Sequence, residues 1–158
     1  MGMQTQVYRT TAPGVAGDPA TPDQMVYQPI NFTAEGDVTV GNFVFPSTTA
    51  PETHAVAAGT GEPLGLVQRE LNHFNYDLTS PGTLVLPEGS TLAVAVRGDF
   101  WVKTSTAATV GQAVFASETD GSISTDDAGA TVSGSVETKW RVKTAGDAND
   151  LIIISAWA

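Results

Sequence analysis

Residues 131–143 read TVSGSVETKWRVK, and apolar and polar side chains alternate through them with a period of two. One face of this stretch receives Val132, Gly134, Val136, Thr138, Trp140 and Val142. The other face receives Thr131, two serines and all four charged side chains. Such alternation is typical of a β-strand with one buried face. It predicts a long strand whose Trp140 points into the core.

The chain on either side of this stretch repeats the pattern in shorter segments. Residues 91–96 place alternate apolar side chains inward, and the pattern resumes at Phe100 and Val102 after Gly98, where a bend or bulge is expected. Further strands are predicted at 38–45, 64–71, 83–86, 112–116 and 151–157, whereas 50–58 reads as a loop. Strands at this spacing, separated by Gly and Pro, are typical of antiparallel folds. We therefore expect an all-β fold, an antiparallel β-barrel or jelly-roll-like sandwich.

The first 25 residues differ in composition from the rest. They hold Pro13, Pro19 and Pro22, and proline fixes φ and favours extended backbone at the residue before it. Neither a helix nor a central strand is expected in such a segment. The sequence thus predicts an extended N-terminal arm, residues 1–25, and a single β-domain over residues 26–158.

Composition and charge exclude several classes of protein. The chain of 158 residues has no cysteine, which removes disulfide scaffolds and thiol chemistry. Its 17 acidic and 7 basic residues give a net charge of −10, so the surface should repel nucleic acid and anionic membranes. The sequence has neither a run of apolar residues long enough to span a bilayer nor a secretory signal, so synthesis in a cytoplasm is expected.

The residues that could carry chemistry do not form a recognisable catalytic or metal-binding pattern. His54 and His73 lack the His-x-His pairing of metal-binding β-barrels, and no Gly-x-Ser-x-Gly elbow is present. The acidic pairs, such as Asp126 with Asp127, lie among turn residues. Arg97-Gly98-Asp99 is interpreted as a strand bend. We therefore expect no cofactor, metal or catalytic residue, although a hydrolase that uses one carboxylate pair stays an alternative.

Several segments taken in order resemble one known family. They are GLVQRE at 65–70, LPEG at 86–89, RGDFWV at 97–102, VGQAVFA at 110–116 and DGSI at 120–123, preceded by VAGDP at 15–19 and VTVGNF at 38–43. This succession resembles the structural cement, or capsid decoration, proteins of tailed bacteriophages. The resemblance covers about residues 12–143, and the C-terminal stretch 151–157 lies outside it.

The resemblance implies a non-enzymatic virion protein that is made in the host cytoplasm and bound to the outer surface of the capsid. Its implied partners are the major capsid protein and other copies of itself, as a dimer or trimer across local symmetry axes. The expected partner-binding residues are Val7, Tyr8, Val15, Gly17, Asp18, Pro19, Met25 and Trp101. The alternative is a receptor- or carbohydrate-binding β-module of a phage tail, but the chain lacks the heptad shaft typical of fibres.

Overall fold

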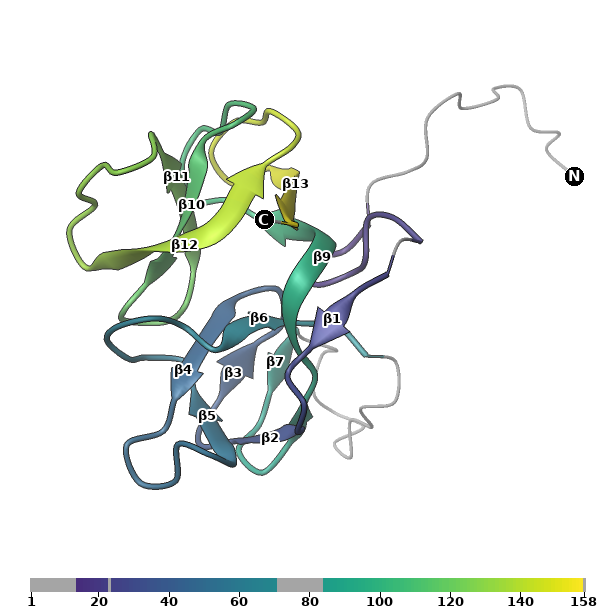
Figure 1. The fold of residues 1–158 in the computed structure, drawn as a ribbon, viewed down its shortest axis with the longest axis vertical. Coiled ribbons are helices and arrows are strands. Elements are labelled where there is room, and N and C mark those ends of the chain that lie inside the picture. The colour runs from purple at the N-terminus through teal and green to yellow at the C-terminus, as the bar shows by residue number, and fades with distance from the viewer. Residues whose placement is uncertain (1–13, 23, 71–83, 158) are drawn as a thin grey trace, which may run out of the picture.

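A computed structural model describes residues 14–22, 24–70 and 84–157, and these residues form strands and turns without a helix (Figure 1). The strands are β1 Val26–Tyr27, β2 Phe32–Ala34, β3 Val38–Thr39, β4 Phe43–Pro46, β5 His54–Val56, β6 Gly65–Val67, β7 Val85–Leu86, β8 Thr91–Leu92, β9 Val94–Lys103, β10 Ala113–Ser117, β11 Ile123–Asp126, β12 Ser135–Val142 and β13 Leu151–Ala156. Their abundant Val, Ile, Phe and Thr side chains favour pleated, half-buried backbone over helix. The predicted all-β class is confirmed.

The strands follow one open path. Their order is β11-β10-β12-β13-β9-β6-β4-β5-β2-β8, with β1 also on β9 and a separate β3–β7 pair. The pairs are antiparallel except β2 with β5. Among the described residues β11 and β8 end the path without meeting, so of the predicted barrel or jelly-roll-like sandwich, a closed barrel is not what forms. The sheet instead changes direction at β9, which pairs with β13 in one half of the molecule and with β6 in the other. The jelly-roll-like arrangement stays a prediction.

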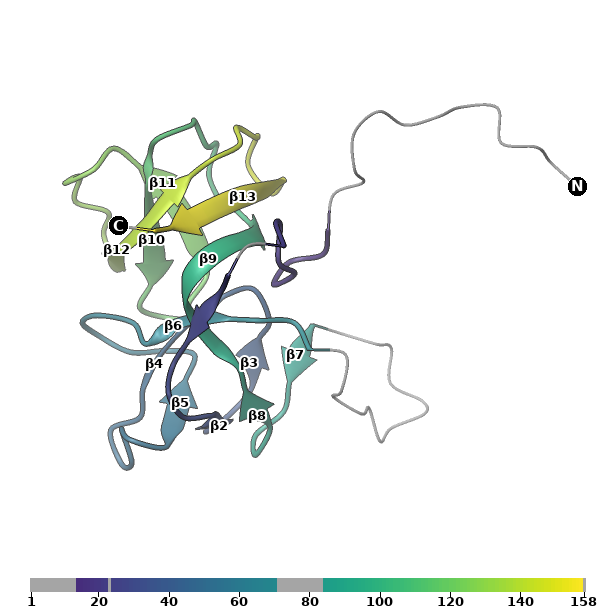
Figure 2. The same cartoon turned by 45° about the vertical axis from the view of Figure 1, so that its right-hand side comes forward.

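Two hydrophobic cores lie on opposite sides of a shared layer. One contains Phe43, Leu66 and Trp140, and the other contains Val44 and Val67. Successive residues of β4 and β6 therefore point into different cores, as the alternation of side chains along a strand requires. Figures 1 and 2 show β10 to β13 on one side and β2 to β8 on the other, with β9 between them. This explains why the short strands β4 and β6 are buried on both faces.

β9 is one continuous strand through Gly98, where the sequence predicted a bend. Gly98 has φ +132°, a conformation that side-chain-bearing residues rarely adopt. A Cβ there would lie 3.0 Å from both Met25 Cγ and Phe100 Cε2. The strand curves visibly between the two halves (Figure 2). Glycine therefore allows β9 to change direction while β13 stays in register with it, whereas the pairing of β1 with β9 shifts register between Val26 and Tyr27.

The alternation around Trp140 predicted that part of the core correctly. Trp140 is buried, and so are Thr138 and Val142, whereas Lys139 is exposed. The observed strand β12 is shorter than the predicted 131–143. The predicted strand 38–45 is divided into β3 and β4 by a turn at Gly41, whose φ is +82°.

Candidate interaction surface

Residues 14–22, called the N-terminal segment below, lie along one edge of β9 (Figure 2). Gly17 N donates to Trp101 O at 2.7 Å, and Trp101 N donates to Asp18 O at 2.9 Å. Ala20 N donates to Asp99 O at 2.8 Å, and Pro19 forms an antiparallel bridge with Phe100. The segment thus pairs like a short strand on the edge of β9 opposite β13. It covers backbone groups that would otherwise leave a sheet edge open.

Gly17 and Asp18 fix this segment to the body of the domain. Gly17 has φ +88°, and a Cβ there would lie 2.5 Å from Val40 Cγ1. Its carbonyl accepts a hydrogen bond from Arg69 N at 2.9 Å. The Asp18 carboxylate accepts from Val15 N at 2.9 Å and pairs with Arg69 Nη1 at 3.2 Å. Position 17 therefore requires glycine, because any side chain would collide with Val40. Position 18 favours aspartate, because its carboxylate binds Val15 N and Arg69.

Asp99 joins both ends of the described chain to β9. Its Oδ2 accepts from Thr21 Oγ1 at 3.1 Å, and its Oδ1 accepts from Trp157 Nε1 at 2.9 Å. Both carboxylate oxygens are used inside the domain, and Gly98 beside it is buried. The interpretation of Arg97-Gly98-Asp99 as a strand bend agrees with this geometry.

The expected partner-binding residues separate into three groups. Gly17, Asp18, Pro19 and Trp101 are brought together by the N-terminal segment. Val15 is exposed, and Met25 packs partly buried against the core and accepts a hydrogen bond from the Tyr27 hydroxyl at its sulfur. Val7 and Tyr8 lie outside the described residues. Sequence reasoning missed Arg69, Asp99 and Trp157, whose role depends on contacts between distant parts of the chain.

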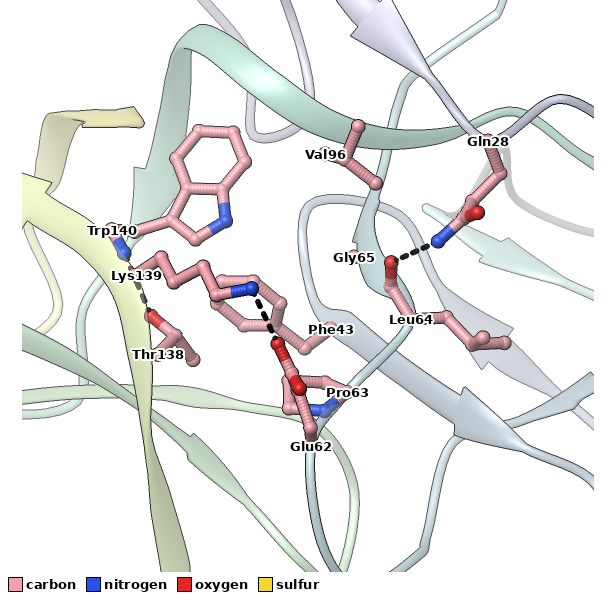
Figure 3. A pocket seen from close by; sticks show the side chains of 10 residues that line it. All are labelled: Gln28, Phe43, Glu62, Pro63, Leu64, Gly65, Val96, Thr138, Lys139 and Trp140. Carbon is pink, nitrogen blue, oxygen red and sulfur yellow. Dashed lines mark hydrogen bonds and ion pairs between the residues drawn. The ribbon is translucent and has the colours of Figure 1, made fainter. Parts of the chain in front are cut away.

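A pocket of about 330 Å³ opens beside Trp140 (Figure 3). Its lining consists of Gln28, Phe43, Glu62, Pro63, Leu64, Gly65, Val96, Thr138, Lys139 and Trp140. Lys139 Nζ and Glu62 Oε1 form an ion pair of 2.8 Å, and Gln28 Nε2 donates to Leu64 O at 2.8 Å. The volume matches the smallest ligand sites, but these polar groups already bind one another.

A bulge in β12 shapes this pocket. Glu137 pairs with Phe115 of β10, and Arg141 pairs with Ala113. Three residues of β12 therefore lie between two pairs that only one residue of β10 separates. Thr138 Oγ1 donates to Val114 O at 2.8 Å and accepts from Trp140 N at 3.2 Å. The Thr138 hydroxyl therefore bonds the Val114 carbonyl and the Trp140 amide, two backbone groups at the irregular part of the β10–β12 pairing. Because the excess is two residues, the parity of β12 is unchanged and Trp140 keeps the inward side that alternation predicts.

Two titratable groups near the strands have shifted pKa values. Burial raises the pKa of Tyr27, and Glu70 adds to the rise while a hydrogen bond with Gln68 opposes it. Burial also acts to raise the pKa of Asp120, but hydrogen bonds with Ser122 and Ser117 outweigh it and leave that pKa lowered. Because Asp120 lies in a turn, its lowered pKa reflects turn geometry.

A second hollow, of about 320 Å³, is lined by the paired strands β2 and β5, the loop at 49–50 and the turn at 88–89. His54 and Glu35 are among its lining residues. The Ser47 hydroxyl donates to Glu35, and His54 Nδ1 is 2.9 Å from Thr53 Oγ1. Within the described ranges, no three His, Cys, Asp or Glu side chains are grouped so that they could hold a metal. In the same part of the chain, no helix has the length and hydropathy to cross a membrane.

Replacing Asp18 by alanine should loosen the N-terminal segment locally. The substitution removes the hydrogen bond to Val15 N and the Arg69 pair, a loss of about 1–2 kcal/mol. We expect about tenfold faster hydrogen exchange at the Gly17 and Trp101 amides. Asp37→Ala, which removes the same charge at another exposed position, is the control. Equal exchange rates in the two variants would contradict the assigned role of Asp18.

Comparison with known proteins places the chain in a family. The profile of the structural cement protein family (E217 gp24/Pam3 gp6) matches residues 3–156. A chain of the capsid of Myoviridae phage XM1 shares the fold, with a TM-score of 0.65 and 17% identity over 98% of this chain and 97% of that one. The N base of head fibre gp8.5 of bacteriophage phi29 is 14% identical over 85% of this chain and 95% of its own, with a TM-score of 0.48. Curated proteins gave no match. Because the profile spans nearly the whole sequence, the chain belongs to the structural cement proteins of bacteriophage virions.

Proposed function

We propose that this protein binds the outer surface of a tailed-phage capsid and joins neighbouring major capsid protein subunits, which stabilises the shell. The observation that carries the proposal is the family match over residues 3–156. The role is structural and involves no reaction. Other copies of the same chain, as a dimer or trimer across local symmetry axes, are its second partner.

The charge of the protein suits a position on the outside of the shell. A net charge of −10 disfavours contact with packaged DNA and with anionic membranes. Neutral loops lose less solvation energy when they are buried in a contact. The loop at 105–110 is such a surface, and its Val110 is 65% exposed.

The arm expected at residues 1–25 is proposed as a strap onto the capsid or an adjacent copy. Its residues 1–13 and 23 lie outside the described part of the chain. Residues 14–22 are bonded to β9, and Gly14, the first described residue, lies against Trp101. At ~3.3 Å per residue, residues 1–13 span at most about 43 Å, enough to cross onto a neighbouring subunit.

Binding of this kind stabilises the shell by mass action. A protein that binds only the assembled state contributes RT ln(1 + [L]/Kd), about 2.7 kcal/mol per site at one hundred times Kd. A shell offers many equivalent sites. The whole particle should therefore gain strength even when each contact is modest.

Removing the protein from purified particles and adding it back should move the temperature at which DNA is released. We expect release at a lower temperature from stripped particles and full recovery at saturating protein. Identical release temperatures with and without the protein would contradict cementing. The receptor- or carbohydrate-binding alternative would then be tested on host cells.

A further inference from the structure

We propose that the outward face of β9, β13 and the end of β12 docks onto an acidic surface of the capsid. This inference rests on the proposed function. The face has an apolar centre of Trp101, Leu151 and Ile153, with Lys103 and Lys143 at its sides. It is called the basic face below.

The strand register places these side chains together. β13 lies between β12 and β9 (Figure 2), and Ile153 pairs with Trp101 while Leu151 pairs with Lys103. Lys143 N donates to Ile153 O at 2.8 Å on the other side of β13. Directly opposed residues in antiparallel strands have Cβ atoms about 5 Å apart. Lys143, Ile153 and Trp101 therefore form one row across the sheet, and Leu151 with Lys103 lies in the next.

Burial shows which side of the sheet this row occupies. Ile152 and Ile154 are fully buried in the core, as are Phe100 and Val102. The residues between them point the opposite way. Leu151, Ile153 and Trp101 are only half-buried, and Lys103 and Lys143 are exposed. An apolar centre flanked by cations is thus open on the outside of the domain.

The charge of this face differs from that of the whole protein, because its two lysines outnumber the one described carboxylate, Asp99, that the register places in the next row. Both oxygens of Asp99 already accept hydrogen bonds, from Thr21 and Trp157. Within the described residues, neither Lys103 nor Lys143 has a carboxylate within ion-pair distance, whereas Lys139 and Arg141 pair with Glu62 and Glu137. The chain as a whole carries −10, so an acidic partner is repelled by most of its surface. The basic face is where such a partner can approach. Charge complementarity therefore selects a protein surface with Asp or Glu carboxylates around an apolar contact.

Charge reversal at single lysines tests this. Lys143→Glu and Lys103→Glu should each weaken binding to stripped shells at least tenfold, about 1.4 kcal/mol, because attraction becomes repulsion. Lys139→Glu is the matched control, since it makes the same charge change at an exposed lysine of β12 that lies outside the basic face. It should change Kd less than twofold. Binding of the unchanged protein should weaken with added salt, and less steeply in Lys143→Glu.

The outcomes separate the two proposals. If the unchanged protein fails to bind stripped shells, the proposed function is wrong, and so is the proposal that the basic face binds the capsid. If it binds and all three variants bind equally, the function stands and the basic face is overturned. Sedimentation of the free protein measures its oligomeric state and tests whether a second copy, rather than the capsid, occupies the basic face. If Lys143→Glu dissociates an oligomer while shell affinity is kept, a second copy occupies this face and the capsid assignment is overturned.

Discussion

Replacing Trp140 by alanine is expected to lower the free energy of unfolding by about 3–5 kcal/mol, a large part of the ~5–15 kcal/mol typical of a whole domain. The indole is 3% exposed. It makes edge-to-face contacts with Phe43 at 6.2 Å and with Phe100 at 5.9 Å between ring centroids. The substitution removes a buried aromatic side chain and leaves a cavity that β4, β9 and β12 cannot close.

The stability of Trp101→Ala provides the comparison, because the Trp101 side chain points away from the core that contains Trp140. Its indole is half-buried and rests against Gly14 of the N-terminal segment. We expect a loss of only about 1–2 kcal/mol, since less apolar area returns to water. Urea unfolding of both variants, with the slope m checked for two-state behaviour, makes the measurement. Small and equal losses would contradict the assignment of Trp140 to the core and Trp101 to the surface.

The alternation around Trp140 placed Thr138, Trp140 and Val142 inward correctly because side chains in a strand have a fixed period. It was wrong for Val132 and Gly134, which precede β12, and Val136 is only half-buried. The same reasoning missed β2, β5 and β11. β2 and β5 are three residues long, and too few positions alternate in them to give a signal. β4 and β6 are buried on both faces between two cores, a state that alternation cannot reveal. The open path of the sheet depends on which strands pair, and sequence periodicity contains no pairing information.

The candidate surface was predictable in part. Pro13, Pro19 and Pro22 indicated an extended segment, and parity indicated that Trp101 points outward. The bonds from Gly17 and Asp18 to Trp101 use backbone atoms that every residue possesses. No residue pattern could therefore identify β9 as the strand to which the segment binds. The basic face was equally hidden, since Lys103 and Lys143 are brought together only by the register of β13.

A glycine in the turn between β10 and β11 should be as sensitive as the core tryptophan. Gly121 is buried with φ +68°, and a Cβ there would lie 1.9 Å from Phe43 O. Phe43 N donates to Gly121 O at 2.9 Å, so the turn docks directly on the first residue of β4. Left-handed backbone costs a side-chain-bearing residue about 1–2 kcal/mol, and forced overpacking adds about 1–3 kcal/mol. Gly121→Ala should therefore cost about 2–5 kcal/mol.

Comparison with Gly129→Ala separates the cost of the contact with Phe43 from the cost of the backbone strain. Gly129 also has positive φ, +80°, but an added Cβ would meet no atom within 4 Å. It should cost only the strain, about 1–2 kcal/mol. Equal losses in urea unfolding would show that the Gly121 contact relaxes freely. A larger loss at Gly121 would mean that Phe43, which also contacts Trp140, joins the β10–β11 turn to the core through its backbone and its ring. The half of the molecule that presents the basic face would then depend on β4 for its position.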